Sequence, residues 1–166
     1  MGAGGLTAPS MLTVDRIVIR APVERVFQVA ADIERWPQIL AHYRWVRFLE
    51  RPATGREAIV EMAAWRPFGP LRYPASWVSR MTVDRPAGEI RYRHLRGITR
   101  GMDVVWRLVS TDHGAAAEVA VEHTWGGPPW PLVGSSIARL IIGPVFVRGI
   151  ASRTLAGIKR HLEEEA

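Results

Sequence analysis

The chain has 166 residues, of which 48% are apolar, and it carries a net charge of +6. An apolar content this high excludes a disordered chain, and the absence of cysteine excludes a disulfide framework, a thiol nucleophile and a cysteine-ligated metal. No apolar run approaches the roughly 18 residues that a membrane span requires.

The basic excess consists of arginine, apart from Lys159. One interpretation of this excess is that the protein binds nucleic acid or an acidic membrane. The other is a compositional preference for arginine over lysine on an ordinary surface. The arginines are spread along the chain, and their one cluster lies within residues 91–100. We therefore favour the second interpretation, and expect no nucleic-acid partner and no stable membrane insertion.

Residues 1–10 lack the basic and apolar regions of a secretory signal, and Leu6 stands where a myristoylation motif needs Ser or Thr. We expect a flexible tail over residues 1–10, a single ligand-binding domain over residues 11–166, and a cytoplasmic protein.

The first elements are predicted from their apolar periods. Residues 12–19 alternate as in a strand, and residues 23–30 place apolar side chains three and four apart, as in a short helix. Residues 31–43 then read as a bent pair of helical turns, with Asp32 placed to cap the first turn. Four apolar or aromatic residues share one face of this stretch: Ile33, Trp36, Leu40 and Tyr43.

From residue 44 the pattern becomes that of strands joined by short turns, which indicates an antiparallel meander. The predicted strands are 44–51, 57–65, 71–84, 89–96, 102–110 and 116–125. Residues 66–70 hold two prolines and a glycine, and residues 126–131 are also rich in proline and glycine. We predict that these two segments are loops at the mouth of a pocket.

The last segment, residues 132–164, carries an apolar stripe with a helical period. One straight helix of this length would reach about 50 Å, whereas a domain of this size is only about 40 Å across. Because Pro144 cannot donate a hydrogen bond to Leu140, we expect a kink or a break at Gly143–Pro144.

This order of elements, with Asp32-Ile-Glu-Arg-Trp-Pro37 followed by Tyr43, resembles the START-like superfamily and, within it, the polyketide cyclase/dehydrase family of aromatase-cyclases. Trp77-Val-Ser79, Met102 and Trp106 match positions associated with the cavity wall of that family. The resemblance implies an α+β helix-grip fold: a seven-stranded antiparallel sheet wrapped around a long kinked C-terminal helix, with two short helices after the first strand.

One position departs from the family pattern. Aromatase-cyclases of this type carry an arginine two residues after the serine, where this chain has Met81. Arg80 is adjacent, but strand alternation points it to the opposite face. The resemblance therefore leaves open whether Met81 abolishes cyclase chemistry.

Alternation predicts which side chains face a pocket between the sheet and the C-terminal helix. Tyr43, Ser79 and His123 are the candidate catalytic residues, because they could handle protons and carbonyl groups. The predicted ligand-binding residues are Trp36, Tyr43, Trp77, Ser79, Met81, Tyr92, His94, Met102, Val104, Trp106, Val121 and His123.

We expect the chain to bind a hydrophobic, ring-containing small molecule, with activity like that of a polyketide cyclase or dehydrase. The alternative is a lipid or quinone carrier without chemistry. The five histidines lack the spacing of metal ligands, and no phosphate-binding or dinucleotide motif occurs, so we expect neither a metal nor a cofactor. The sequence is compatible with a monomer or a homodimer.

Overall fold

The computed structural model describes residues 11–51, 55–68, 70–126 and 144–165. Seven antiparallel strands form one curved sheet in the order β1-β7-β6-β5-β4-β3-β2. The strands are β1 (Met11–Ile19), β2 (Tyr43–Glu50), β3 (Glu57–Phe68), β4 (Leu71–Asp84), β5 (Glu89–Arg96), β6 (Asp103–Thr111) and β7 (Ala116–Trp125).

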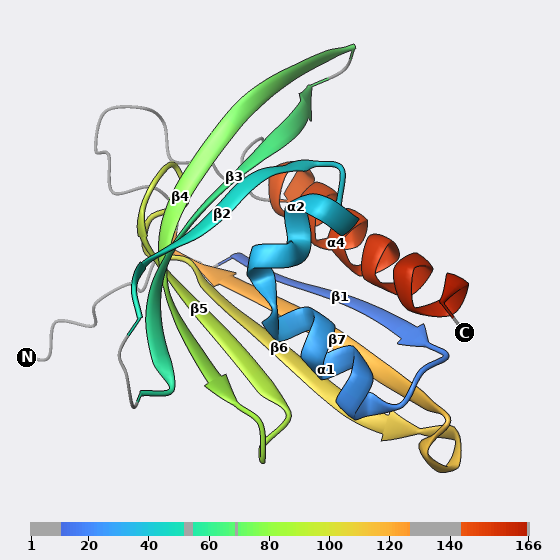
Figure 1. The fold of residues 1–166 in the computed structure, drawn as a ribbon. Helices are drawn as coiled ribbons and strands as arrows, with labels where there is room; N and C mark the ends of the chain where they lie inside the picture. Colours follow the sequence, from blue (N-terminus) through green and yellow to red (C-terminus); the bar gives the residue numbers. More distant parts are fainter. Residues whose placement is uncertain (1–10, 52–54, 69, 127–143, 166) are drawn as a thin grey trace, which may run out of the picture.

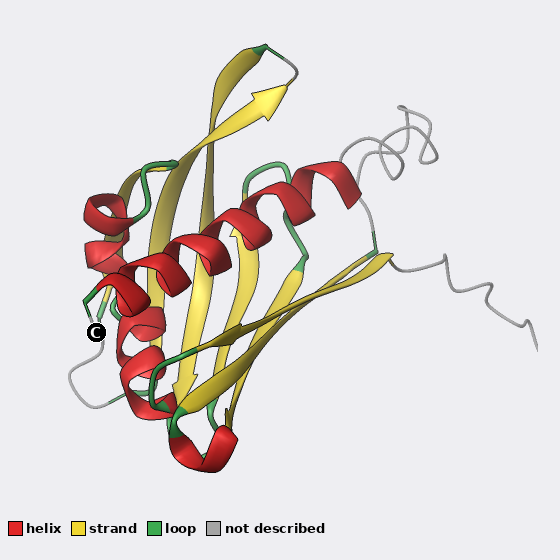
Figure 2. Cartoon of the chain, turned by 90° about the vertical axis from the view of Figure 1, so that its right-hand side faces the viewer, coloured by secondary structure: helices red, strands yellow, loops and turns green. Residues whose placement is uncertain are grey.

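The helices lie on the inner side of this curved sheet. α4 (Pro144–Glu164) crosses in front of the strands, and the β3–β4 hairpin extends beyond it (Figure 2). Between β1 and β2 the chain forms α1 (Val23–Ala31), the 3-10 turn η1 (Ile33–Arg35) and the single turn α2 (Trp36–Ile39) (Figure 1). A further 3-10 turn, η2 (Asp112–Gly114), joins β6 to β7. The predicted α+β architecture is confirmed.

Period-two alternation explains how the sheet buries its inner face. In β7 buried and part-exposed residues alternate without a break from Ala117 to Trp125, because Val119, Val121 and His123 all point inward. In β4 three consecutive residues, Trp77 to Ser79, are buried, and the β4–β5 register shifts between Val78 and Ser79. Such an irregularity interrupts the alternation of the strand, so that adjacent residues can both be buried.

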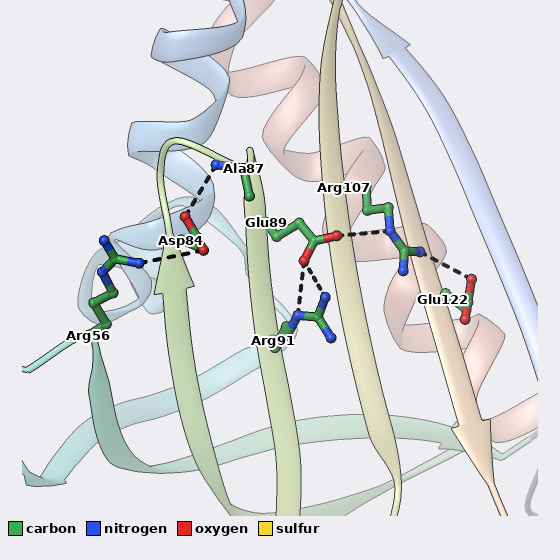
Figure 3. A network of polar contacts seen from close by, with 7 residues as sticks. All are labelled: Arg56, Asp84, Ala87, Glu89, Arg91, Arg107 and Glu122. Carbon is green, nitrogen blue, oxygen red and sulfur yellow. Dashed lines mark hydrogen bonds and ion pairs between the residues drawn. The ribbon is translucent and has the colours of Figure 1, made fainter.

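The outer face of the sheet carries many arginines that are paired with acidic residues, besides exposed apolar side chains such as Leu12 and Val109. Figure 3 shows Glu89 accepting hydrogen bonds from Arg91 and from Arg107, which also reaches Glu122 at 3.2 Å. Similar pairs join Arg16 to Glu118, Arg47 to Glu61 and Arg93 to Asp103. Much of the basic residue content is thus neutralised on this face.

The predicted loop at residues 66–70 is wrong, because β3 continues to Phe68 and pairs with β4 up to Leu71. The β2–β3 pairing ends at Ala64, so the last residues of β3 have a strand neighbour only in β4. Pro67 lacks an amide hydrogen, but a strand that is open on one side tolerates that loss.

Two smaller expectations need correction or lie outside the described ranges. Asp32 makes no side-chain capping hydrogen bond; only its carbonyl oxygen accepts one, from the Arg35 amide at 3.2 Å. The expected kink at Gly143–Pro144, the helical segment 132–143 and most of the predicted loop 126–131 lie outside the described residues, and α4 begins at Pro144.

Candidate functional site

A cavity lies between the inner face of the sheet and α4. It encloses about 70 Å³, room for roughly five water molecules if each needs about 10–15 Å³. Strands β2 to β7, α2, the β5–β6 connection and α4 all contribute to it. The lining residues are Trp36, Tyr43, Met62, Arg66, Trp77, Tyr92, His94, Thr99, Met102, Val104, Trp106, Val121, His123, Val147, Ile150, Ala151 and Thr154.

Aromatic rings form a continuous wall along one side of the cavity. The Trp36 ring lies 5.1 Å from Tyr43 in an edge-to-face arrangement and 5.8 Å from Trp106. Tyr43 in turn lies 6.3 Å from Trp77, whose ring is stacked on His94 at 6.1 Å. Such contacts fix ring positions beyond what apolar burial alone achieves, so the wall presents flat, ordered surfaces to a ligand.

Arg66 brings a positive charge into this aromatic wall. Its side chain comes from β3, is only 5% exposed, and lies 5.6 Å from the centre of the Trp77 ring. Burial lowers its pKa to about 10, although the nearby Tyr73 and Tyr43 hydroxyls oppose that change. The guanidinium therefore remains charged at neutral pH, and it can donate hydrogen bonds to a ligand oxygen.

Two histidines in the cavity are neutral at physiological pH. Burial lowers the pKa of His94 to about 3, helped by the charge that His123 carries when protonated and by Arg66, and burial lowers the pKa of His123 to about 4, helped by Arg66. His94 Nδ1 is hydrogen-bonded to Thr99 Oγ1 at 2.6 Å. His123 Nδ1 is buried without a hydrogen-bond partner among the described residues, so His123 keeps an open polar atom.

The two cavity tyrosines are protonated and differ in their partners. Burial raises the pKa of Tyr43 to about 12, while a hydrogen bond with the Thr154 side chain acts in the opposite direction. Burial also raises the pKa of Tyr92, whose hydroxyl has no hydrogen-bond partner within the described part of the chain. Tyr92 lies in the same row of the sheet as Val104 and His123.

Ten of the predicted ligand-binding residues line the cavity: Trp36, Tyr43, Trp77, Tyr92, His94, Met102, Val104, Trp106, Val121 and His123. Ser79 and Met81 are buried but are not among the lining residues, so the structure does not bring Ser79 together with Tyr43 and His123 at the cavity surface. Tyr43 and His123 remain candidate catalytic residues.

Sequence reasoning missed several lining residues. Arg66 was assigned to a loop, because proline and glycine surround it. Met62 lies within the predicted strand 57–65, and Arg66 follows the same inward alternation, so this pattern could have identified Met62 directly and Arg66 once the strand was extended. Thr99 lies in a connection, and Thr154 lies one residue off the apolar stripe of α4, so neither followed from strand alternation.

The cavity thus combines one cation, two neutral imidazoles and two phenols inside an aromatic wall. This set can donate to or accept from several oxygen atoms of a ligand, and Arg66 can polarise a carbonyl group. Across the described ranges, no group of three or more His, Asp or Glu residues could hold a metal ion. Within the same ranges, no helix is long and apolar enough to cross a membrane.

Comparisons with known proteins concern the family and the fold of the chain. Residues 19–141 match the model of a family described as polyketide cyclase / dehydrase and lipid transport. A protein of Streptomyces cyaneus named "Putative polyketide cyclase" is 30% identical over 109 residues, a match that covers 61% of this chain and 65% of that protein.

Solved structures share the fold. The Zhui aromatase/cyclase of Streptomyces sp. R1128 superimposes with a TM-score of 0.76 at 19% identity, covering 93% of this chain and 94% of that one. A START superfamily protein from Mycobacterium smegmatis gives a TM-score of 0.69 at 15% identity, covering 93% of this chain and 99% of that one. At these identities the superpositions show a common architecture and no more.

Proposed function

The chain belongs to the family of polyketide cyclases, dehydrases and lipid-transport proteins, it has the helix-grip fold of START-like proteins, and we propose that it binds a hydrophobic, oxygen-bearing ring compound or its open-chain precursor in the cavity under α4. In the leading form of the proposal, it promotes ring closure of a polyketone by holding the chain in a reactive conformation.

The observation that carries the proposal is the buried Arg66 guanidinium in an otherwise aromatic wall. A carbonyl or enolate oxygen accepts a charge-assisted hydrogen bond from a guanidinium, and such a bond is stronger than one from a neutral donor. A guanidinium in the cavity lining therefore supports a ligand that bears at least one strong acceptor over a pure hydrocarbon chain.

The same residues could support an intramolecular aldol reaction. A methylene carbon between two carbonyl groups would give its proton to the neutral His123, and that carbon would form a bond to a carbonyl carbon of the same molecule. The carbonyl oxygen would then take up a proton, and loss of water would complete the unsaturated ring. Arg66 would stabilise the negative charge on oxygen, and Tyr43 would donate a hydrogen bond.

The cavity volume limits what fits without rearrangement. About 70 Å³ is well below the roughly 300–1,000 Å³ typical of ligand sites. Met62 and Met102 both line the cavity, and the flexible methionine side chain can adopt other rotamers at little cost. We therefore expect binding to be accompanied by movement of these side chains.

The carrier alternative is supported by a separate observation. An imidazole whose pKa is about 4, as for His123, is a weak base, and its charged form is too scarce at neutral pH to act as a general acid. If catalysis needs a stronger base than this, the protein would hold and transfer its ligand without changing it.

Native mass spectrometry of the purified protein, followed by extraction of co-purifying molecules, separates the two readings. An aromatic polyketide, or an empty protein that then binds planar polyphenols, favours the cyclase-like form. A bound fatty acid, isoprenoid or quinone favours the carrier form.

A titration of tryptophan fluorescence with a trihydroxyanthraquinone and with palmitic acid then tests the role of Arg66. The Arg66→Met variant should bind the anthraquinone at least about tenfold more weakly, the loss expected for a hydrogen bond to a charged group. Met81→Leu, a buried change outside the cavity lining, serves as the control and should bind normally. Equal loss in both variants, or none in Arg66→Met, would contradict the proposal.

A further inference from the structure

A second hollow, distinct from the cavity, lies between α4 and the segment that joins α2 to β2. This α2–α4 groove has a volume of about 450 Å³, within the range of small-molecule sites. Its lining residues are Ile39, Leu40, Ala41, His42, Arg153, Ala156, Gly157 and Arg160.

The groove follows from a close contact between the two segments. A Cβ atom on Gly157 would lie 2.4 Å from Leu40 Cδ2, so glycine is what allows the chain to approach α4 this closely. Arg153 and Arg160 lie on either side of this contact along α4. They are seven residues apart and therefore share a helix face, separated by about 10 Å along the axis.

The charge of the groove is unbalanced. Arg153 and Arg160 are both exposed, no acidic residue lines the groove, and neither arginine forms an ion pair with any residue in the described ranges. The arginines of the outer sheet face, in contrast, are mostly paired, as described above. The α2–α4 groove is thus a place where part of the net positive charge is concentrated and open to a ligand.

His42 connects this groove to the cavity. Its Nε2 atom is 3.0 Å from Thr154 Oγ1, and Thr154 lines the cavity and is hydrogen-bonded to Tyr43. Burial, followed by the charges of Arg153 and Arg66, lowers the pKa of His42 to about 4. A negative charge bound at Arg153 would therefore be felt by the His42 imidazole.

We propose that the α2–α4 groove is a binding site for a phosphate group, held by Arg153 and Arg160 at the surface of the protein. Guanidinium groups match the geometry and charge of phosphate oxygens. The apolar part of the lining, from Ile39 to Ala41 and at Ala156, would contact an organic substituent. The ligand is therefore a phosphate ester with an apolar group, or free phosphate. This site does not depend on the function proposed for the cavity.

Isothermal titration calorimetry of the full chain at constant ionic strength, with phenyl phosphate and with inorganic phosphate up to about 10 mM, tests the site. Arg153→Ala and Arg160→Ala should each weaken binding by roughly three- to tenfold, since both contacts are exposed to solvent. Arg96→Ala removes another exposed arginine outside the groove and should leave the affinity unchanged.

The proton NMR signals of His42, assigned with a His42→Asn variant, give an independent readout of location. Bound phosphate should shift them and raise the pKa of His42 toward its ordinary value. Tighter binding of phenyl phosphate identifies an organic ester as the ligand class, and equal binding identifies free phosphate; both support the site. No binding, equal weakening by Arg96→Ala, or binding that leaves the His42 signals unmoved would overturn it. Ligand binding in the cavity, measured by tryptophan fluorescence, can succeed or fail independently.

Discussion

Replacing Arg66 by methionine should make the protein more stable and less able to bind its ligand. Burial lowers the pKa of Arg66 to about 10. At about 1.4 kcal/mol for each pKa unit, holding this charge inside the protein costs on the order of 3 kcal/mol. Methionine keeps an unbranched apolar chain against Trp77 but loses the cation–π contact, which contributes about 1 kcal/mol, and the other contacts of the guanidinium. The net gain should therefore be at most about 2 kcal/mol.

Urea unfolding at pH 7, followed by tryptophan fluorescence, measures this change, and thermal unfolding should show a melting temperature higher by up to roughly 4–8 °C. The sign follows from the pKa: a cation whose pKa is lowered by folding destabilises the folded state wherever it is charged, which includes neutral pH. Arg66→Lys keeps a buried charge and should give no such gain. A less stable Arg66→Met protein that binds the anthraquinone as tightly as the original chain would refute the reasoning.

Two further predictions concern pH and helix packing. Folding lowers the pKa of both His94 and His123, so the unfolded chain binds more protons than the folded chain between about pH 4 and pH 6.5. The free energy of unfolding should therefore fall as the pH drops through this window, by about 2 kcal/mol for each histidine between pH 7 and pH 5. Urea unfolding of the His123→Gln variant should show a shallower fall. Gly157→Ala should lower the free energy of unfolding by roughly 1–3 kcal/mol, because the new Cβ atom meets Leu40. Gly149→Ala lies in the same helix, and its Cβ atom meets nothing within 4 Å, so this substitution should raise the free energy of unfolding by about 0.5–1 kcal/mol. Equal effects of the two substitutions would contradict the packing argument.

Local patterns were enough to predict the sheet and its inner face. Strict alternation in β7 put Val121 and His123 on the cavity side, and the same rule placed Val104 and Trp106. These predictions depend only on the two-residue period of a strand, which a short run of sequence already contains.

The position of the cation could not be predicted in the same way. Proline at position 67 normally interrupts a sheet, and only the end of the β2–β3 pairing at Ala64 explains why it is tolerated here. Ser79 and Met81 show a different limit of prediction from strand alternation. Alternation correctly put both on the inner face, but it does not reveal which part of that face the helices cover and which part they leave open as a cavity.

The position of Arg66 also indicates how a ligand would be oriented. In the sheet register Arg66 is opposite Tyr73, and Met81, where the family pattern has its arginine, is opposite Ala58. These two levels are eight residues apart along β3, about 26 Å at about 3.3 Å per residue. The positive charge therefore enters the cavity from the end that carries the β3–β4 hairpin, and the strongest acceptor of the ligand should lie at that end.

Two polar atoms of the cavity restrict the choice of ligand further. Tyr92, directly opposite Met81 in the register, has a buried hydroxyl without a partner among the described residues, and so does His123 Nδ1 in the same row. A saturated hydrocarbon tail would leave both atoms unsatisfied, at about 1–3 kcal/mol each. A ligand with oxygen atoms toward Arg66 and also toward Tyr92 would satisfy them all. We therefore expect a polyoxygenated chain or ring to bind more tightly in this cavity than a simple lipid whose only polar group is at one end.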